Sequence, residues 1–308
     1  MSETVATALN TALHDASLAG SGLDHRPQLL SSEAAHQCHA YAYLTLRWAS
    51  DRKPIPGDRA RRKKRERVER DALLEELRDI GITVHSQFNN ADISYDGCDG
   101  HLRVDLQAAA MDSKYLDGQW HVVDVVPYPH TQYQKLIKDG LLAAFPFHYS
   151  RMQLGMHFSG LSWALHIAMD RDTYETTPLR LPYDEAYAKR LVSKELRIIY
   201  AERKPVGISV DYNYFQCAMC AQRDVCHGVK PPLRNCRTCA RSVVEPAGGW
   251  GCSKHKKALT EAEQRKGCEF HRYVPSMLAG TMAEHDKDWT FVRYMLPDGT
   301  EWTDRGPA

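Results

Sequence analysis

The clearest strand pattern in the chain lies at residues 120–126, which read Trp-His-Val-Val-Asp-Val-Val. Apolar character on both faces is typical of a strand inside a covered sheet, so this segment predicts a central strand. Residues 163–169 predict a second strand, and apolar positions three and four apart predict a helix over 131–144 and another from His148. Because strands alternate with helices here, we expect an α/β domain with a mixed sheet.

Helices are also predicted before and after this region. Ser31 and Ser32 can cap a helix that runs to about residue 49, and Asp184 can cap one that runs to about residue 201. Before the central strand, an apolar stripe predicts a further helix that ends at Gly81. The stripe consists of Val68, Leu73, Leu77 and Ile80.

Short turns and a polar leader complete the pattern. Asp-Gly pairs at 96–97, 99–100 and 117–118 predict hairpin turns. Near the C-terminus, residues 296–299 form a polar turn between two short strand-like segments, which predicts a closing hairpin. Residues 1–28 are small and polar, so we expect no element there and interpret them as a flexible leader.

A run of basic residues lies between residues 59 and 70. It consists of Arg59, Arg61, Arg62, Lys63, Lys64, Arg65, Arg67 and Arg70. The run can be the solvated end of a helix, or it can be a surface that binds the phosphates of a nucleic acid. For the second interpretation, the candidate ligands are Arg61, Arg62, Lys63 and Lys64.

Composition narrows the class of protein. The chain has 308 residues, of which 43% are hydrophobic and 26% charged, and a net charge of +1 predicts no global attraction to nucleic acid. Residues 1–25 lack a basic segment followed by an apolar run, and the apolar segment 140–147 is too short to cross a bilayer. We therefore expect a cytoplasmic protein without membrane contact, whose nine cysteines bind metal rather than form disulfides.

Cysteines and histidines recur at short, regular spacings between residues 217 and 271. They read Cys217-x2-Cys220-x5-Cys226, then Cys236-x2-Cys239-x12-Cys252-x2-His255-x12-Cys268-x2-His271. A Cys-x2-Cys loop places two thiolates on one side of a turn, which suits a tetrahedral metal or a cluster, so two metal centres are predicted. For zinc in the second centre, the expected ligands are Cys236, Cys239, Cys252 and Cys268, with His255 and His271 as alternatives. The remaining Cys98 is interpreted as a structural thiol.

These features resemble a known family. The early cysteine Cys38, the segment Gly100-His101-Leu102, the strand 120–126 and the late cysteines are similar to the RecB-type branch of the PD-(D/E)XK nucleases, especially phage-borne exonucleases and CRISPR-associated iron–sulfur nucleases. The resemblance covers residues 31–275 and implies a restriction-endonuclease-like core with a mixed sheet. It also implies a 4Fe–4S cluster that fastens two distant parts of the chain together, with Cys38, Cys217, Cys220 and Cys226 as its ligands. In the alternative interpretation, Cys38 is only a buried thiol.

The catalytic positions depart from this family. Its chemistry needs two acidic groups for Mg²⁺ and a lysine, and the second strand supplies Asp124 but has Val126 where the lysine belongs. On the first strand, Gln107 replaces the metal-binding aspartate and Ala108 the glycine, although a frame shifted by two residues would let Asp105 serve. Lysines that can take over the missing role are Lys135 and Lys138.

We expect four segments in the chain. They are the leader 1–28, a nuclease-like domain with the iron–sulfur cluster over 29–229, a zinc-binding module over 230–276 and the hairpin 277–308. Three functions follow as hypotheses: a catalytically degenerate nuclease-fold protein of phage or prophage DNA metabolism, an active Mg²⁺-dependent exonuclease with a remodelled site, and a metal-clustered redox or regulatory protein. The expected partners are DNA and a phage recombination or replication protein. Mg²⁺ is expected only if the site is active.

Overall fold

The structure is a computed structural model that describes residues 2–18, 25–52, 56–86 and 93–306. The chain divides into two units. We call the first the sheet unit; it consists of Met1–Asp24, Arg52–Tyr95 and Val104–Ala188. We call the second the cysteine unit; it consists of His25–Asp51, Asp96–Arg103 and Lys189–Ala308.

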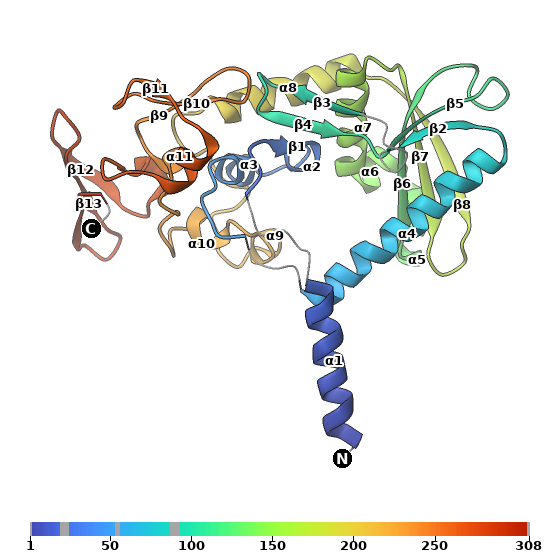
Figure 1. The fold of residues 1–308 in the computed structure, drawn as a ribbon, viewed down its shortest axis with the longest axis horizontal. Helices are drawn as coiled ribbons and strands as arrows, with labels where there is room; N and C mark the ends of the chain where they lie inside the picture. Colours follow the sequence, from blue (N-terminus) through green and yellow to red (C-terminus); the bar gives the residue numbers. More distant parts are fainter. Residues whose placement is uncertain (1, 19–24, 53–55, 87–92, 307–308) are drawn as a thin grey trace. The chain divides into compact units, whose positions relative to one another are not determined.

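A five-stranded sheet forms the centre of the sheet unit (Figure 1). Its strands, in spatial order, are β2 (Thr83–Ser86), β5 (Ala108–Met111), β6 (His121–Tyr128), β7 (Trp163–Asp170) and β8 (Thr176–Pro182). The pair β6 and β7 is parallel and the other pairs are antiparallel. The predicted mixed α/β architecture is therefore confirmed, with the apolar strand β6 at the middle of the sheet as expected.

Helices cover both faces of this sheet. They are α4 (Gly57–Asp79), α5 (His130–Asp139), α6 (Leu141–Ala144) and α7 (Pro146–Ser159). Val123 and Val125 of β6 pack in one core with Leu73 and Leu74 of α4. Because strand residues alternate between faces, Val122 and Asp124 point the other way, toward α7.

Gly155 lets α7 approach β6 closely. A Cβ atom built at this glycine would lie 3.3 Å from Val122 Cγ1 and 2.9 Å from Leu106 Cδ2. A larger residue would therefore have to displace a stiff β-branched side chain. This close contact brings the first two turns of α7 over the Asp124 face of the sheet.

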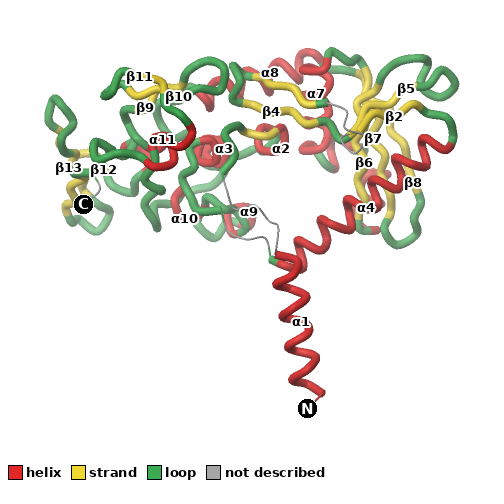
Figure 2. Tube along the Cα trace, in the orientation of Figure 1, coloured by secondary structure: helices red, strands yellow, loops and turns green. Residues whose placement is uncertain are grey.

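The cysteine unit is built from short elements (Figure 2). Its helices include α2 (Ser31–Ala34), α3 (His39–Leu46), α9 (Phe215–Ala218), α10 (Arg223–Cys226) and α11 (Glu261–Lys266). Two antiparallel sheets follow one another along the chain: β9 (Ser242–Val244), β10 (Trp250–Cys252) and β11 (Lys257–Ala258), then β12 (Thr281–His285), β13 (Val292–Met295) and β14 (Glu301–Asp304). The predicted closing hairpin is β13–β14, to which β12 adds a third strand.

A further small sheet and two further helices belong to the fold. A sheet of order β1-β4-β3 contains β1 (Leu29–Leu30), β4 (Leu102–Asp105) and β3 (Ser94–Gly97). The helix predicted from Asp184 is α8 (Glu185–Ile199). Helix α1 (Ser2–Leu18) lies in the segment where no element was predicted.

Several predicted elements differ from the structure. The helix expected over 31–49 is broken into α2 and α3, and Cys38 has an extended backbone at the N-cap of α3. The helix expected over 131–144 is interrupted at Gly140, whose φ of +75° a helix cannot contain. On α4, Val68 and Ile80 of the expected stripe are exposed, because Leu73 and Leu74 fill the buried positions. Among the described residues, no helix combines the length and apolar character needed to cross a membrane.

Candidate functional site

The carboxylate of Asp124 lies at the centre of the sheet unit and is surrounded by side chains that bind it. Gln107 Nε2 donates a hydrogen bond of 2.8 Å to Oδ1. On the other oxygen, His148 Nδ1 lies 3.2 Å and His166 Nδ1 3.1 Å from Oδ2. Arg151 Nη2 is 3.8 Å from Oδ1. Four side chains thus engage both oxygens of a residue that is only 3% exposed.

These partners are held in place by further contacts. The Oε1 atom of Gln107 accepts a hydrogen bond of 2.9 Å from the backbone N–H of Val125, so both ends of this amide are used. The Nε2 atom of His166 lies 3.2 Å from the hydroxyl of Tyr128. His166 faces Asp124 because the two residues are paired in the parallel register of β6 and β7. The carboxylate is therefore fixed from several sides, although Gln107, His148 and Arg151 also line a cavity beside it.

Charge keeps Asp124 ionised. Burial alone would raise the pKa of this carboxyl, but the Arg151 guanidinium and the hydrogen bonds from His148 and His166 outweigh it and hold the pKa well below its usual value. The negative charge is already balanced inside the protein, so little of it is left to attract a metal ion.

A basic cavity opens beside this network, on the same edge of the sheet. Its volume is about 500 Å³. The basic side chains that line it are Arg62, Lys63, Arg67, Arg70, Arg151 and Arg171. Within the described chain, Glu66 is the one carboxylate in its lining, and it forms an ion pair with Arg171. Gln107 and Val126 also line the cavity.

This composition does not fit a catalytic Mg²⁺ ion. A hard divalent cation prefers several carboxylate oxygens, and here six cationic side chains face one carboxylate that is already paired. Anions with several oxygen atoms, such as phosphate groups, match the cavity much better, because arginine and lysine bind them by charge-assisted hydrogen bonds.

One face of α4 supplies most of this charge. Arg62, Lys63, Arg67 and Arg70 line the cavity, as expected for positions separated by about one and two helical turns. Of the four candidate phosphate ligands from the sequence, the structure therefore places Arg62 and Lys63 in the cavity lining. Arg61 and Lys64 do not line it.

The remaining candidates for catalysis are not gathered at Asp124. Asp105 lies at the end of β4, where its Oδ1 accepts a hydrogen bond of 2.7 Å from Ser94 Oγ, and it does not line the basic cavity. Lys135 is exposed on α5, with Nζ 6.0 Å from the ring centroid of Phe145, which does line it. Lys138 is exposed on the same helix.

Sequence reasoning missed His148, His166 and Arg151 as partners of Asp124. The one signal for His166 is an imidazole inside the apolar strand β7, a position that usually requires a polar partner. His148 and Arg151 reach Asp124 only because α7 packs closely on β6. Nothing in their local sequence predicts that packing.

A second polar group lies at the end of β7. His130 Nδ1 is 2.6 Å from Asp170 Oδ2, and the backbone N–H of Asp172 donates to Asp170 Oδ1 at 2.9 Å. Both oxygens of the buried Asp170 are thus bound within the turn. These contacts stabilise the turn that connects β7 to β8.

In the cysteine unit, the first set of predicted ligands comes together. Burial, followed by the proximity of Cys38, Cys226 and Cys217, raises the pKa of Cys220 to about 11. The Cys-x2-Cys turn is closed by a hydrogen bond of 2.9 Å from Cys220 N–H to the Cys217 carbonyl, and the N–H of Gln222 points at Cys220 Sγ at 3.4 Å. Four neighbouring thiols with an amide donor fit the iron–sulfur cluster that the resemblance implies.

The second set of cysteines surrounds a cavity of about 160 Å³, which we call the cysteine cavity. Its thiols are those of Cys236, Cys239, Cys252 and Cys268. The backbone N–H of Arg241 lies 3.5 Å from Cys239 Sγ. The backbone N–H of Cys239 donates to the Cys236 carbonyl at 3.2 Å, as Cys220 does to Cys217 in the first set. His255 Nε2 is 3.7 Å from Cys268 Sγ.

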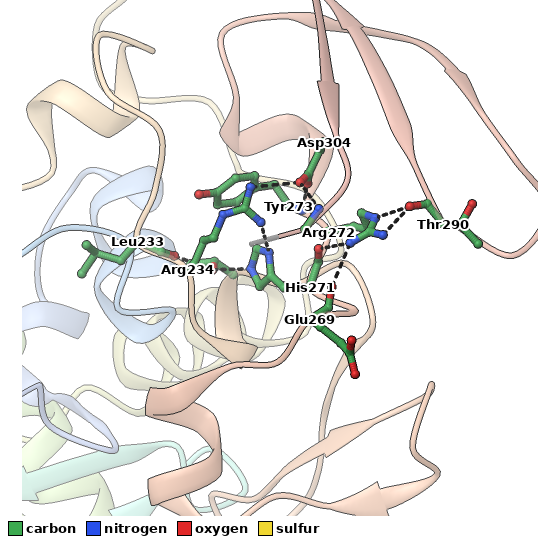
Figure 3. A network of polar contacts seen from close by, with 10 residues as sticks. Leu233, Arg234, Glu269, His271, Arg272, Tyr273, Thr290 and Asp304 are labelled. Atoms are coloured by element: carbon green, nitrogen blue, oxygen red, sulfur yellow. Dashed lines mark hydrogen bonds and ion pairs between the residues drawn. The ribbon is translucent and has the colours of Figure 1, made fainter. Parts of the chain in front are cut away.

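The two histidines of this set differ. Both ring nitrogens of His271 have partners: Nδ1 lies 3.3 Å from Arg234 Nη1, and Nε2 lies 3.1 Å from Thr238 Oγ1 (Figure 3). Arg234 also binds Asp304, which accepts from the backbone N–H of Tyr273. Arg234 and the backbone of Tyr273 therefore anchor β14 to this module, and His271 is buried against Arg234, whereas His255 is exposed at the rim.

Cys98 belongs to neither set. It is buried in the turn between β3 and β4 with a φ of +50°, and burial raises its pKa to about 12.

No protein family and no curated protein matches the chain by sequence. Similar solved structures include LHK-Exo in complex with dAMP, at 13% identity and a TM-score of 0.43, over 56% of this chain and 86% of that one. An alkaline exonuclease (LHK-Exo) from Laribacter hongkongensis has 13% identity and a TM-score of 0.42 over 57% and 87% of the two chains. SSO0001 has 11% identity and a TM-score of 0.38 over 71% and 96%. The mixed α/β architecture is consistent with a nuclease-like fold.

Proposed function

We propose that this protein binds DNA through a nuclease-like core and does not hydrolyse it. The observation that carries the proposal is the network around Asp124: the carboxylate expected to hold a metal is bound instead by Gln107, His148, His166 and Arg151. Loss of the metal removes the charge that stabilises phosphoryl transfer, which is typically worth several kcal/mol.

The basic cavity supports binding of phosphate groups. Six cationic side chains converge on it, although the net charge of the whole chain is only +1. Such a local concentration of arginine and lysine attracts the nucleic-acid backbone without reading its sequence. The resemblance to phage-borne exonucleases favours a role in phage or prophage DNA metabolism in the bacterial cytoplasm, with a recombination or replication protein as partner.

The first cysteine set supports a structural cofactor. A 4Fe–4S cluster on Cys38, Cys217, Cys220 and Cys226 would close a loop of about 180 residues, whose entropy costs about 4–5 kcal/mol plus a constant. Cluster binding offsets this cost because it becomes folding free energy. The fold would then be kept by the cluster independently of the lost chemistry.

Binding is tested by two matched double variants on one helix. Arg62→Ala with Lys63→Ala removes two charges from the basic cavity, and Arg61→Ala with Lys64→Ala removes two charges outside its lining. We expect the first variant to weaken binding to labelled duplex or single-stranded DNA and to lower the salt slope, log Kd against log salt, by about 1.4–1.8. The second variant should change it by much less. Equal effects, or no DNA binding at low salt, would remove the cavity from this role.

Hydrolysis is tested separately. Labelled linear duplex and single strands should stay intact with Mg²⁺ or Mn²⁺, and the paired change Gln107→Asp with Val126→Lys is the variant expected to regain cleavage. Robust cleavage by the unmodified protein, abolished by Asp124→Ala, would contradict the proposal. It would establish instead the remodelled exonuclease, in which Asp105, Asp124 and Lys135 or Lys138 act.

A further inference from the structure

We propose that the cysteine cavity binds a second 4Fe–4S cluster rather than a zinc ion. Its ligands are Cys236, Cys239, Cys252 and Cys268. This inference does not depend on the proposed DNA binding. It replaces the zinc expected from the sequence, because spacing along the chain counts ligands but does not measure the distance between them.

The first argument is the separation of the sulfur atoms. Four thiolates at 2.3 Å from a tetrahedral zinc ion lie about 3.8 Å from one another. Among the described residues, His130, Asp170 and Asp172 form a group whose possible metal-binding atoms all lie within 4.8 Å of one another. No three of the four cysteine sulfurs lie that close together. The thiols are therefore arranged more widely than a single ion requires.

The second argument is the space between them. A zinc ion in contact with four sulfurs leaves no room at the centre of its site. Here the thiols surround a cavity of about 160 Å³, closed on other sides by Leu259 and Phe270. A cube of four iron and four sulfide ions fills such a space and bonds outward to thiolates on its walls.

The charge of the lining is compatible with this cluster. Four thiolates give a net charge of about −2 with an oxidised 4Fe–4S cluster, as they do with a zinc ion, so the separation of the sulfurs and the space between them decide between the two. Lys254, Lys257 and Lys266 line the cavity together with Arg241, whose backbone N–H lies 3.5 Å from Cys239 Sγ. The one carboxylate in the described lining is Glu263, which is paired with Lys257.

The ligand set is restricted to the four thiols. His271 lines the cavity, but both of its ring nitrogens are engaged by Arg234 and Thr238. His255 lies 3.7 Å from Cys268 Sγ at the exposed rim, where it can shield the cluster without bonding to iron.

The experiment is metal and sulfide analysis of the full-length protein purified without oxygen. We expect about eight iron and eight sulfide ions per chain, and the variant Cys252→Ser should lose about half of each. Cys220→Ser should lose the other half, and Cys98→Ser, a buried cysteine outside both sets, should lose none. Electron paramagnetic resonance after reduction should show two cluster signals, of which Cys252→Ser keeps one.

Loss of one zinc ion, or of no metal, from Cys252→Ser would overturn the proposal. If that variant does not fold, the unmodified protein decides: one zinc with at most four iron ions contradicts a second cluster, and eight iron ions without zinc support it. If the unmodified protein holds four iron ions and no zinc, Cys220→Ser decides. Iron that survives that change belongs to the cysteine cavity, whereas its complete loss overturns the proposal.

Discussion

Potential metal ligands have different surroundings in the Asp124 network and in the two cysteine sites. Asp124 is bound on both oxygens by side chains of its own unit, and the adjacent cavity is lined by cations. The cysteines of the other unit are adjacent to one another, and one set of them faces an open cavity. The thiols that line the cysteine cavity are thus accessible from it, whereas Asp124 is held by protein side chains on both of its oxygens.

Two buried carboxylates, Asp124 and Glu195, have pKa shifts of opposite sign. Asp124 has four polar partners, and its pKa is lowered. Glu195 in the cysteine unit is 0% exposed, and Lys194 Nζ lies 3.1 Å from its Oε1. Burial outweighs that lysine and raises the pKa of Glu195 to about 7. The number of partners, more than burial itself, decides the sign of the pKa shift.

The largest effect is expected from opening the first cysteine set. Cys217→Ser should cost more than about 5 kcal/mol, because the metal's binding free energy is also folding free energy, and most of the protein should become insoluble. Cys98→Ser changes an equally buried thiol outside both sets and should cost only about 1–2 kcal/mol. Thermal unfolding and the soluble fraction measure both. Similar losses in the two variants would mean that Cys217 acts only as a core residue.

The next effect concerns Asp124. Asp124→Ala leaves His148, His166 and Arg151 without their shared acceptor, and should destabilise the protein by about 3–5 kcal/mol. Since the folded pKa lies below the ordinary value of 3.8, this stability is present above that pH and is lost as the pH falls toward the folded pKa. Urea unfolding at pH 7 and pH 3 should therefore show a smaller difference between the variant and the unmodified protein at pH 3. A cost below about 1 kcal/mol at pH 7 would show that the network is not structural.

Glu195 should give the opposite pH dependence. Its folded pKa of about 7 lies above the ordinary 4.5, so its contribution is present below pH 4.5 and is lost as the pH rises to about 7, by up to about 3 kcal/mol. Glu195→Gln should remove this slope from the free energy of unfolding between pH 4.5 and 7. An unchanged slope would mean that the Lys194 ion pair keeps the carboxyl ionised.

The sequence predicted the parts of this molecule that depend on local pattern. Strands β6 and β7 were predicted because their apolar runs are nearly unbroken. The two cysteine sets remain a prediction as metal sites, based on the spacing of their doublets. Strand β8 was missed because Pro178 and Pro182 argue against a strand, yet both are tolerated at the edge of a sheet.

The surroundings of Asp124 could not be predicted in the same way. Its contact with His166 depends on the register of two parallel strands, and its contacts with His148 and Arg151 depend on the close packing of α7 at Gly155. The departures from the family pattern at Gln107 and Val126 can be read from the sequence, but the hydrogen bond from Gln107 to Asp124 required the three-dimensional structure.

The smallest effect is expected from His255, which tests how the cysteine cavity is closed. This histidine is exposed, and its Nε2 atom lies 3.7 Å from Cys268 Sγ. If four thiols complete the site, His255→Ala should keep the full metal content and lose less than about 0.5 kcal/mol of stability, as is usual for surface changes. His271→Ala is the comparison, because it removes a buried ring whose two nitrogens contact Arg234 and Thr238, and it should cost about 1–3 kcal/mol without releasing metal. Metal analysis and thermal unfolding of both variants decide the point: metal lost from His255→Ala but kept in His271→Ala would make His255 a ligand and reduce the number of thiols that bind.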